Sequence, residues 1–285
     1  MSKLLTIGMS TYDDYDGVYF TIQALRLYHN ICNTNSIEFI VIDNNPTSKH
    51  GELTKTFINN NVKGTYIPYT EKVSSFNKYK IPDFATGKYI LILDSHVLIE
   101  QNGIETLLNY YESNTNCKNL VQGPLLYDDL KNYSTHFDPV WRGHMYGTWG
   151  TNKEAYNKGQ PFEIPMQGMG LCSFEKESWV GINPNFIGFG AEEGYISEKF
   201  RQAGGKNICI PQLKWNHRFG RHSGVSYRLN LEDRIWNYFI GRLEIYKDPA
   251  HPQILEVYHY FKDKIPTGKI DQIFQKAKNG EKSWF

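Results

Sequence analysis

A carboxylate and an imidazole stand two residues apart in the tripeptide Asp94-Ser95-His96, which follows the apolar run 89–93. Side chains at positions i and i+2 of an extended chain point to the same side, so both can reach one cation. A carboxylate combined with an imidazole suits Mn²⁺, which accepts nitrogen ligands, whereas Mg²⁺ prefers oxygen alone. The spacing predicts a metal site; its plain alternative is an aspartate that caps a turn beside a surface histidine.

A third metal ligand would have to come from another part of the chain, and His217 is the candidate. It follows the strand-like segment 206–210 and could return to the same sheet edge, although any one of the nine histidines could equally be an ordinary surface or core residue. Arg218 and Arg221 lie close to it, and guanidinium groups match the oxygens of a diphosphate. The alternative for this basic region is a solvated face.

Two adjacent glutamates, Glu192 and Glu193, open a predicted helix directly after the glycine-containing segment 186–191. One carboxylate could deprotonate an attacking hydroxyl while the other orients a sugar. Acidic residues in a first helical turn are also expected because the helix dipole stabilises negative charge near the N-terminus of a helix. The pair alone is therefore compatible with either role.

The elements that must position these residues alternate between strand-like and helix-like patterns. Apolar runs at 4–9, 37–42 and 89–93 predict strands, and Val18, Ile22 and Leu25 repeat as one helical face. Near-continuous apolar strands separated by helices predict an α/β fold, Rossmann-like, with a mostly parallel sheet flanked by helices. Ligands bind such sheets at the carboxyl ends of the strands. Three polar clusters stand at those ends: Ser10-Thr11-Tyr12, Asp43-Asn44-Asn45 and Asp94-Ser95-His96.

The composition excludes several classes of protein. The 285 residues are 40% hydrophobic and 21% charged, which excludes a disordered, collagen-like or coiled-coil chain. A net charge of +1 provides no overall field toward nucleic acid or membrane. Neither a G-x-G-x-x-G after the first strand nor a G-x-x-x-x-G-K-[ST] occurs, which disfavours the usual dinucleotide and P-loop sites.

The sequence shows no apolar run of membrane-spanning length, and its N-terminus turns polar too early for a signal sequence. The four cysteines form no C-x-x-C pair. We therefore expect a cytoplasmic protein without membrane contact. Its oligomeric state stays open.

The segment 127–162 is rich in Gly, Trp, Tyr, His and Asn and has no sustained period, which predicts a long functional loop. We expect it to line an acceptor channel, although its aromatic residues could instead anchor the loop to the core. Helical patterns follow, and we divide the chain into a catalytic domain, 1–246, and a C-terminal helical extension, 247–285. The candidate acceptor-binding residues are Trp141, His144, Tyr146 and Trp149.

Several motifs together resemble the catalytic domain of polypeptide N-acetylgalactosaminyltransferases. That family carries an Asp-Ser-His metal motif, a Gly-Gly segment, a W-G-G-E-N helix start, a C-G-G turn and a downstream histidine motif in this order. The corresponding segments here are 94–96, 166–180, 188–197, 202–205 and 215–219. The resemblance extends from about Leu4 to Tyr246, and the histidine is discriminating because most family-2 type glycosyltransferases have D-x-D instead.

The resemblance implies a GT-A fold, a UDP-sugar donor and Mn²⁺ (or Mg²⁺) held by Asp94, His96 and His217. Glu192, Glu193, Arg218 and Arg221 would be the catalytic residues. The implied activity is transfer of a hexosyl or N-acetylhexosaminyl group to an acceptor hydroxyl. The candidate donor-binding residues are Thr11, Tyr12, Asp43, Asn77, Lys80, Asp94, Ser95, Gly168, Gly170 and His222.

Two departures from the family bear on the stereochemistry. Ala191 replaces a glycine, and Glu193 replaces the asparagine of the E-N pair. With a second acidic residue, the pair becomes similar to the E-D pair of inverting enzymes. In those enzymes the second carboxylate is the catalytic base. We expect retention, because the metal and histidine motifs agree with the retaining family, and Glu193 as an inverting base is the competing hypothesis.

The acceptor stays open among a protein, a glycan and a modified base in DNA. Basic residues between 199 and 234 and six lysines in the C-terminal tail favour the nucleic-acid alternative, while the near-neutral net charge disfavours it. A non-catalytic carbohydrate-binding protein is a further alternative, which the intact metal motif argues against. The missing lectin domain and membrane anchor of the family favour a microbial or viral enzyme.

Overall fold

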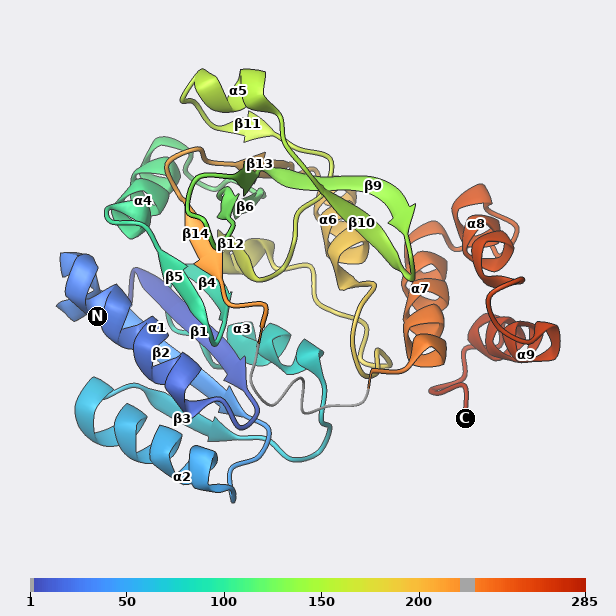
Figure 1. The fold of residues 1–285 in the computed structure, drawn as a ribbon, viewed down its shortest axis with the longest axis horizontal. Helices are drawn as coiled ribbons and strands as arrows, with labels where there is room; N and C mark the ends of the chain where they lie inside the picture. The colour runs from blue at the N-terminus through green and yellow to red at the C-terminus, as the bar shows by residue number, and fades with distance from the viewer. Residues whose placement is uncertain (1–2, 221–228) are drawn as a thin grey trace.

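In the computed structural model, which describes residues 3–220 and 229–285, an eight-stranded sheet forms the centre of the molecule (Figure 1). Its strands β4, β1, β2 and β3 are parallel neighbours, and β12 pairs antiparallel with both β4 and β6. The mostly parallel sheet predicted from the apolar runs is confirmed. In spatial order the strands are β11 (Phe162–Glu163), β13 (Asn207–Cys209), β6 (Leu120–Gln122), β12 (Leu171–Glu175), β4 (Tyr89–Asp94), β1 (Leu5–Thr11), β2 (Ile37–Asp43) and β3 (Thr65–Pro68).

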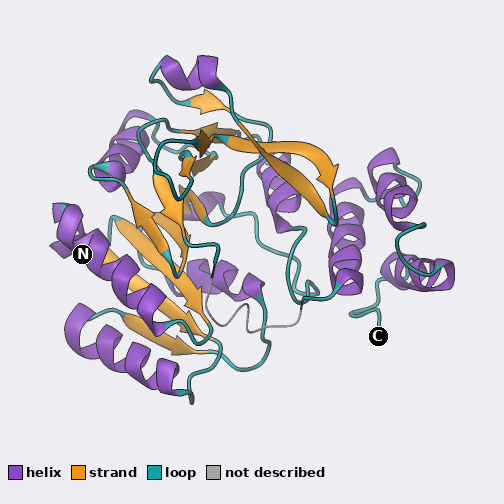
Figure 2. Ribbon diagram, viewed as in Figure 1, coloured by secondary structure: helices purple, strands orange, loops and turns teal. Residues whose placement is uncertain are grey.

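Helices cover both faces of this sheet because its strands carry apolar side chains on both sides (Figure 2). Along β4, Ile90 and Ile92 enter one core with α3, α6, α7, α8 and α9, while Leu91 and Leu93 enter the other with α1 and α4. This alternation follows from the two-residue period of a strand. The helices are α1 (Tyr15–Tyr28), α2 (Lys49–Thr56), α3 (Ile81–Phe84), α4 (Gly103–Ser113), α5 (Lys153–Asn157), α6 (Glu192–Gln202), α7 (Leu231–Tyr246), α8 (Pro252–Phe261) and α9 (Thr267–Lys278).

A smaller sheet brings the distant histidine to the end of the main sheet. Its order is β5 (Val97–Ile99), β14 (Trp215–His217), β7 (Leu125–Leu126) and β8 (Tyr133–Ser134). Strand β5 follows the Asp-Ser-His turn at the end of β4, and β14 pairs with it antiparallel, with His217 opposite Val97. This register places His217 beside a turn that lies more than a hundred residues earlier in the chain.

The segment 127–162 is not the long loop that its composition predicted. Much of it forms the antiparallel hairpin β9 (His136–Arg142) and β10 (Met145–Gly150), followed by the short helix α5. The period was missed because side chains of the hairpin are only partly buried, and a register shift between Tyr146 and Thr148 interrupts the alternation. Figure 1 shows the hairpin reaching from the sheet toward α7 and α8.

The C-terminal helices α8 and α9 pack against α7 and complete one of the two cores (Figure 1). Ile254, Phe261 and Ile270 are fully buried there, and the Trp284 indole donates to Asp233 of α7 at 2.9 Å. The residues after 246 are therefore part of the same packed unit. No helix within 3–220 or 229–285 is long and apolar enough to span a membrane.

Candidate active site and metal centre

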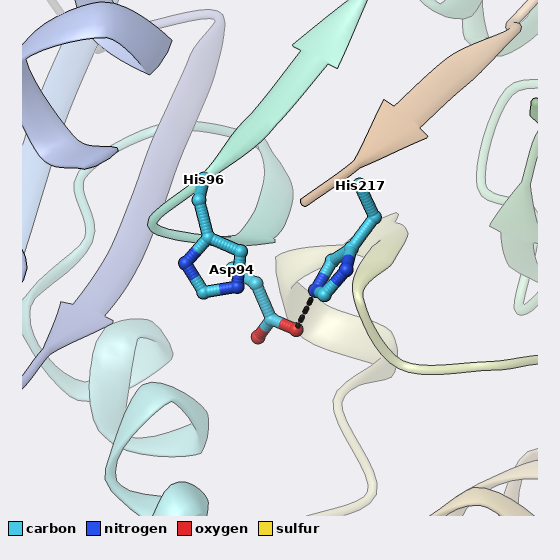
Figure 3. A group of neighbouring side chains, drawn as sticks. All are labelled: Asp94, His96 and His217. Atoms are coloured by element: carbon cyan, nitrogen blue, oxygen red, sulfur yellow. Dashed lines mark hydrogen bonds and ion pairs between the residues drawn. The ribbon is translucent and has the colours of Figure 1, made fainter. Parts of the chain in front are cut away.

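Asp94, His96 and His217 converge at the carboxyl end of β4, as Figure 3 shows. Each offers one ligand atom, and these atoms all lie within 4.8 Å of one another. Nε2 of His217 lies 3.2 Å from Oδ2 of Asp94. The structure thus brings together the three residues that the sequence proposed as metal ligands.

The chemistry of this cluster fits a manganese ion. One carboxylate and two imidazoles form a mixed oxygen and nitrogen donor set, which favours Mn²⁺ over Mg²⁺. Nε2 of His217 faces Asp94 and is the nitrogen placed to share an ion with it. Nδ1 on the other side of the ring is buried and has no hydrogen-bond partner among the described residues.

Lys78 is a functional candidate that the sequence reasoning missed. The residue is 5% exposed, and Nζ donates to Oδ1 of Asp94 at 2.8 Å and to the carbonyl of Met169 at 2.7 Å. Burial alone would raise the pKa of Asp94, but the Lys78 ammonium and the hydrogen bond with His217 hold it well below its usual value. Lys78 therefore keeps the carboxylate ionised and able to bind a cation.

The sequence pointed instead to Asn77 and Lys80, and the structure places both outside this cluster. The segment Ser75–Lys80 is a 3₁₀ helix, in which residues i and i+3 lie on one face. Asn77 and Lys80 share such a face and line a separate cavity with Tyr69 and Trp179. Neither the polar residues at the strand ends nor the spacing of charged residues in the sequence indicates which residue of this 3₁₀ helix reaches Asp94.

Glu192 and Glu193 begin α6 and line a cavity together with Asp94, His96 and His217. They are 3% and 6% exposed, and Oε2 of each has no hydrogen-bond partner within the described parts of the chain. Burial raises the pKa of Glu192, although the Lys78 ammonium opposes the shift. Burial and then the charge of Glu192 raise the pKa of Glu193 well above its usual value.

Asp94, His96, Lys78 and Glu192 line two cavities at once. The first, of about 560 Å³, lies at the ends of β1 and β4 and contains Thr11, Tyr12 and Ser95 from the predicted donor site. The predicted Asp43 is 1% exposed and does not line it; its carboxylate accepts hydrogen bonds from Tyr66 and from the backbone of Asn45. Its neighbour Asn44 lines the cavity instead.

The second cavity, of about 950 Å³, is an aromatic cleft on the other side of the metal ligands. Gly168 and Gly170, which the resemblance implied to be donor-binding residues, form part of its wall. A Cβ at Gly168 would lie 2.7 Å from the Trp149 ring, and one at Gly170 would lie 3.0 Å from the Trp215 ring. Any larger residue would push against these rings, most strongly at Gly168, because the backbone passes directly beside them.

A comparison of the sequence with known protein families shows the family of this chain. Residues 6–175, more than half of the chain, match the family described as Glycosyl transferase family 2. The chain belongs to glycosyl transferase family 2. No curated protein sequence matches it significantly.

Solved structures place this family 2 chain among GT-A transferases. It resembles GalNAc-T7, solved with UDP, GalNAc and Mn²⁺, with a TM-score of 0.68 at 15% identity, over 99% of this chain and 55% of that one. It therefore spans about half the length of that protein. The GT-A fold is confirmed, and so is the likeness to the N-acetylgalactosaminyltransferase catalytic domain.

Two further neighbours have the same fold at a TM-score of 0.58. One is the mannosyltransferase PcManGT from Pyrobaculum calidifontis, solved with GDP-Man and Mn²⁺ (15% identity, 98% of this chain, 75% of that chain). The other is TarS 1–349 of S. aureus (9% identity, 97% and 72%). At these identities the likeness shows the fold alone, and the neighbours differ in the nucleotide that they bind.

Within this family 2 chain, the predicted acceptor residues do not come together in one site. Trp149 lines the aromatic cleft. Trp141 and Tyr146 do not: Trp141 stacks on Tyr260 of α8, and Tyr146 lies in another cavity beside α7. His144 is exposed at the hairpin turn, where its carbonyl accepts from Arg234 at 3.4 Å. Trp141 therefore anchors the hairpin to α8, which was the alternative to a role in acceptor binding.

The remaining candidates concern positive charge. Arg218 is half exposed and pairs with Asp14 at 2.8 Å. Arg221 and His222 lie outside the described residues. Ala191, which replaces the glycine of the related family, has a φ of 83° directly before α6, in the left-handed region that glycine favours.

Proposed function

We propose that this chain is a metal-dependent glycosyltransferase that moves a sugar from a UDP-sugar to an acceptor hydroxyl with retention of configuration. The observation that carries the proposal is the Asp94, His96 and His217 cluster, with Lys78 and Glu192 joining it to both cavities. The first cavity then holds the nucleoside diphosphate, and the aromatic cleft receives the donor sugar and the acceptor. Neighbours of the same fold bind UDP or GDP-mannose together with Mn²⁺.

Asp94, His96 and His217 would hold Mn²⁺, which, when bound, acts as a Lewis acid toward a diphosphate leaving group. Lys78 keeps Asp94 ionised and balances its charge. Glu192 lines both cavities. Its Oε2, which has no partner among the described residues, is placed to form hydrogen bonds with hydroxyl groups of the sugar of the UDP-sugar.

A screen of nucleotide sugars for hydrolysis with and without Mn²⁺ tests the donor and its sugar. We expect a UDP-sugar to be hydrolysed only with the metal, and Asp94→Asn and His217→Ala to lower the rate by at least 100-fold. Mn²⁺-independent hydrolysis, or unchanged rates in both variants, would contradict the proposed metal site. Preference for a GDP-sugar would contradict the UDP assignment alone.

Retention is supported by the Asp94, His96 and His217 cluster, because its residues match the metal and histidine motifs of the retaining family that the sequence resembles. Burial and the charge of Glu192 raise the pKa of Glu193, a direction that also suits a general base, so Glu193 as an inverting base is the competing mechanism. NMR of the product distinguishes the two mechanisms, since a UDP-α-sugar should yield an α-linked product. A β-linked product would establish inversion and return Glu193 to the role of base.

For the acceptor, the cleft favours a neutral group with a flat face, such as a sugar ring of a glycan, over a base in DNA. Its described lining contains one lysine, Lys78, which is already paired with Asp94, and no arginine. Binding to nucleic acid normally requires several cations for the phosphates. Glycan and peptide arrays, with duplex DNA at two salt concentrations as a comparison, test this preference.

A further inference from the structure

Asp14 connects the two halves of the candidate metal site. Its Oδ2 accepts from Nδ1 of His96 at 2.8 Å and from the Ser95 hydroxyl at 3.0 Å, and its Oδ1 accepts from Arg218 at 2.8 Å. Ser95 and His96 belong to the turn after β4, whereas Arg218 directly follows His217. One carboxylate therefore contacts both segments that carry the ligands.

The position of Asp14 in the chain does not explain these contacts. It is the residue before α1, where an aspartate commonly caps the helix, yet its side chain makes no capping hydrogen bond. The residue is 8% exposed. Its carboxylate is directed at the metal turn and Arg218 rather than at the helix.

The contact with His96 has a chemical consequence. A carboxylate accepts hydrogen bonds, so Nδ1 of His96 must carry the proton. In a neutral imidazole the other nitrogen, Nε2, then carries the lone pair that a metal requires. Carboxylates that hold a histidine ligand in this way typically raise metal affinity by 10- to 100-fold.

We propose that Asp14 is a positioning residue of the metal site, which selects the Nδ1–H tautomer of His96 and holds Arg218 beside His217. The inference rests on the metal site of the proposed function. It adds a residue from the first strand–helix connection that neither the motifs nor the family match assigns.

Two measurements test it without turnover. Long-range ¹H–¹⁵N NMR of the metal-free protein reports the His96 tautomer, and competition with a chelator reports the Mn²⁺ affinity. We expect the Nδ1–H tautomer in the wild type, and in Asp14→Asn a shift toward Nε2–H with a 10- to 100-fold weaker Mn²⁺ affinity. Asp233→Asn is the control, because it also alters a buried, hydrogen-bonded carboxylate but lies on α7 against Trp284.

The outcomes separate this inference from the proposed function. A wild-type protein that does not bind Mn²⁺ refutes the metal site itself, and the inference with it. Wild-type binding together with an Nε2–H tautomer of His96 overturns the role of Asp14 without any variant. Equal Mn²⁺ affinities of Asp14→Asn, Asp233→Asn and the wild type overturn it as well.

Discussion

Lys78 illustrates how one buried charge controls the candidate site. Its ammonium stabilises the ionised form of Asp94, and Asp94 in turn raises the pKa of Lys78 against the effect of burial. Because the folded pKa of Asp94 lies below the unfolded value of about 3.9, its contribution to stability is present at neutral pH. That contribution is lost as the pH falls below about 4 toward the folded pKa.

Replacing Lys78 by Met should therefore lower the free energy of unfolding at neutral pH by about 2 kcal/mol, a usual value for a hydrogen bond to a charged group. It should also flatten the loss of stability below pH 4, because the pKa of Asp94 rises. Urea unfolding between pH 3 and 7 measures both effects. Lys80→Met, on another face of the same 3₁₀ helix, should cost less than about 0.5 kcal/mol, and equal losses in the two variants would contradict the assignment.

Glu193 is expected to destabilise the ligand-free protein. Its folded pKa is raised, so between the unfolded and folded values the native state binds more protons, and stability falls as the pH rises through this range. Glu193→Gln should thus raise the free energy of unfolding by about 1 kcal/mol at neutral pH, as is common when an unfavourable functional group is removed. Thermal unfolding at pH 5 and 8 checks the sign, and a gain larger at pH 5 than at pH 8 would contradict it.

At the scale of elements, β14 is held in place by a close approach of backbone. A Cβ at Gly123 would overlap the carbonyl oxygen of Leu213, and the Gly123 carbonyl accepts from the Trp215 indole at 2.8 Å. Gly123→Ala should displace β14 and with it His217. We expect a loss of about 1–3 kcal/mol of stability and a lower Mn²⁺ affinity. Gly268→Ala, where a Cβ meets open space in α9, should leave the Mn²⁺ affinity unchanged.

The hairpin β9–β10 contributes to the cleft through one of its two tryptophans. Trp149 packs against Phe137, with ring centroids 4.3 Å apart, and lines the cleft, so Trp149→Ala should raise the acceptor KM far more than the donor KM. Trp141→Ala removes contacts with Tyr260 and Glu256 of α8. It should lower stability without raising the acceptor KM more than the donor KM. Steady-state kinetics with each substrate varied measures the difference; equal changes in both KM values for Trp149→Ala would refute its role.

At the scale of the whole molecule, the C-terminal helices are part of the core. Deleting 247–285 would expose the apolar face of α7 that now packs on Ile254, Phe261, Ile270 and Ile273. We expect the truncated chain to be insoluble or to lose its cooperative thermal transition. A chain ending at Gly280, which loses the hydrogen bond of Trp284 to Asp233 and the ion pair of Glu281 with Lys276, should keep a transition at a lower temperature. A stable fragment 1–246 would show that the extension is independent.

Local patterns in the sequence were enough to predict what depends on neighbouring residues. The parallel strands follow from apolar runs, and the placement of Glu192 and Glu193 follows from a helix start. Asp94 and His96 lie close together as predicted, but a turn at Ser95 and His96 brings them together, not the extended chain on which the prediction rested. Each of these is a short-range property of the backbone. The hairpin β9–β10 was not predicted because β10 is partly buried along its whole length and buried residues of β9 are adjacent, so neither strand alternates.

Only the tertiary structure decided which distant residues meet. The pairing of β5 with β14 brings His217 to Asp94, the turn of a 3₁₀ helix directs Lys78 rather than Lys80 to the site, and the start of α1 places Asp14 against His96. Trp141 and Trp149 lie only eight residues apart in the same predicted segment, yet one contacts α8 and the other lines the cleft. These contacts depend on the packing of whole elements, which no local spacing of residues encodes.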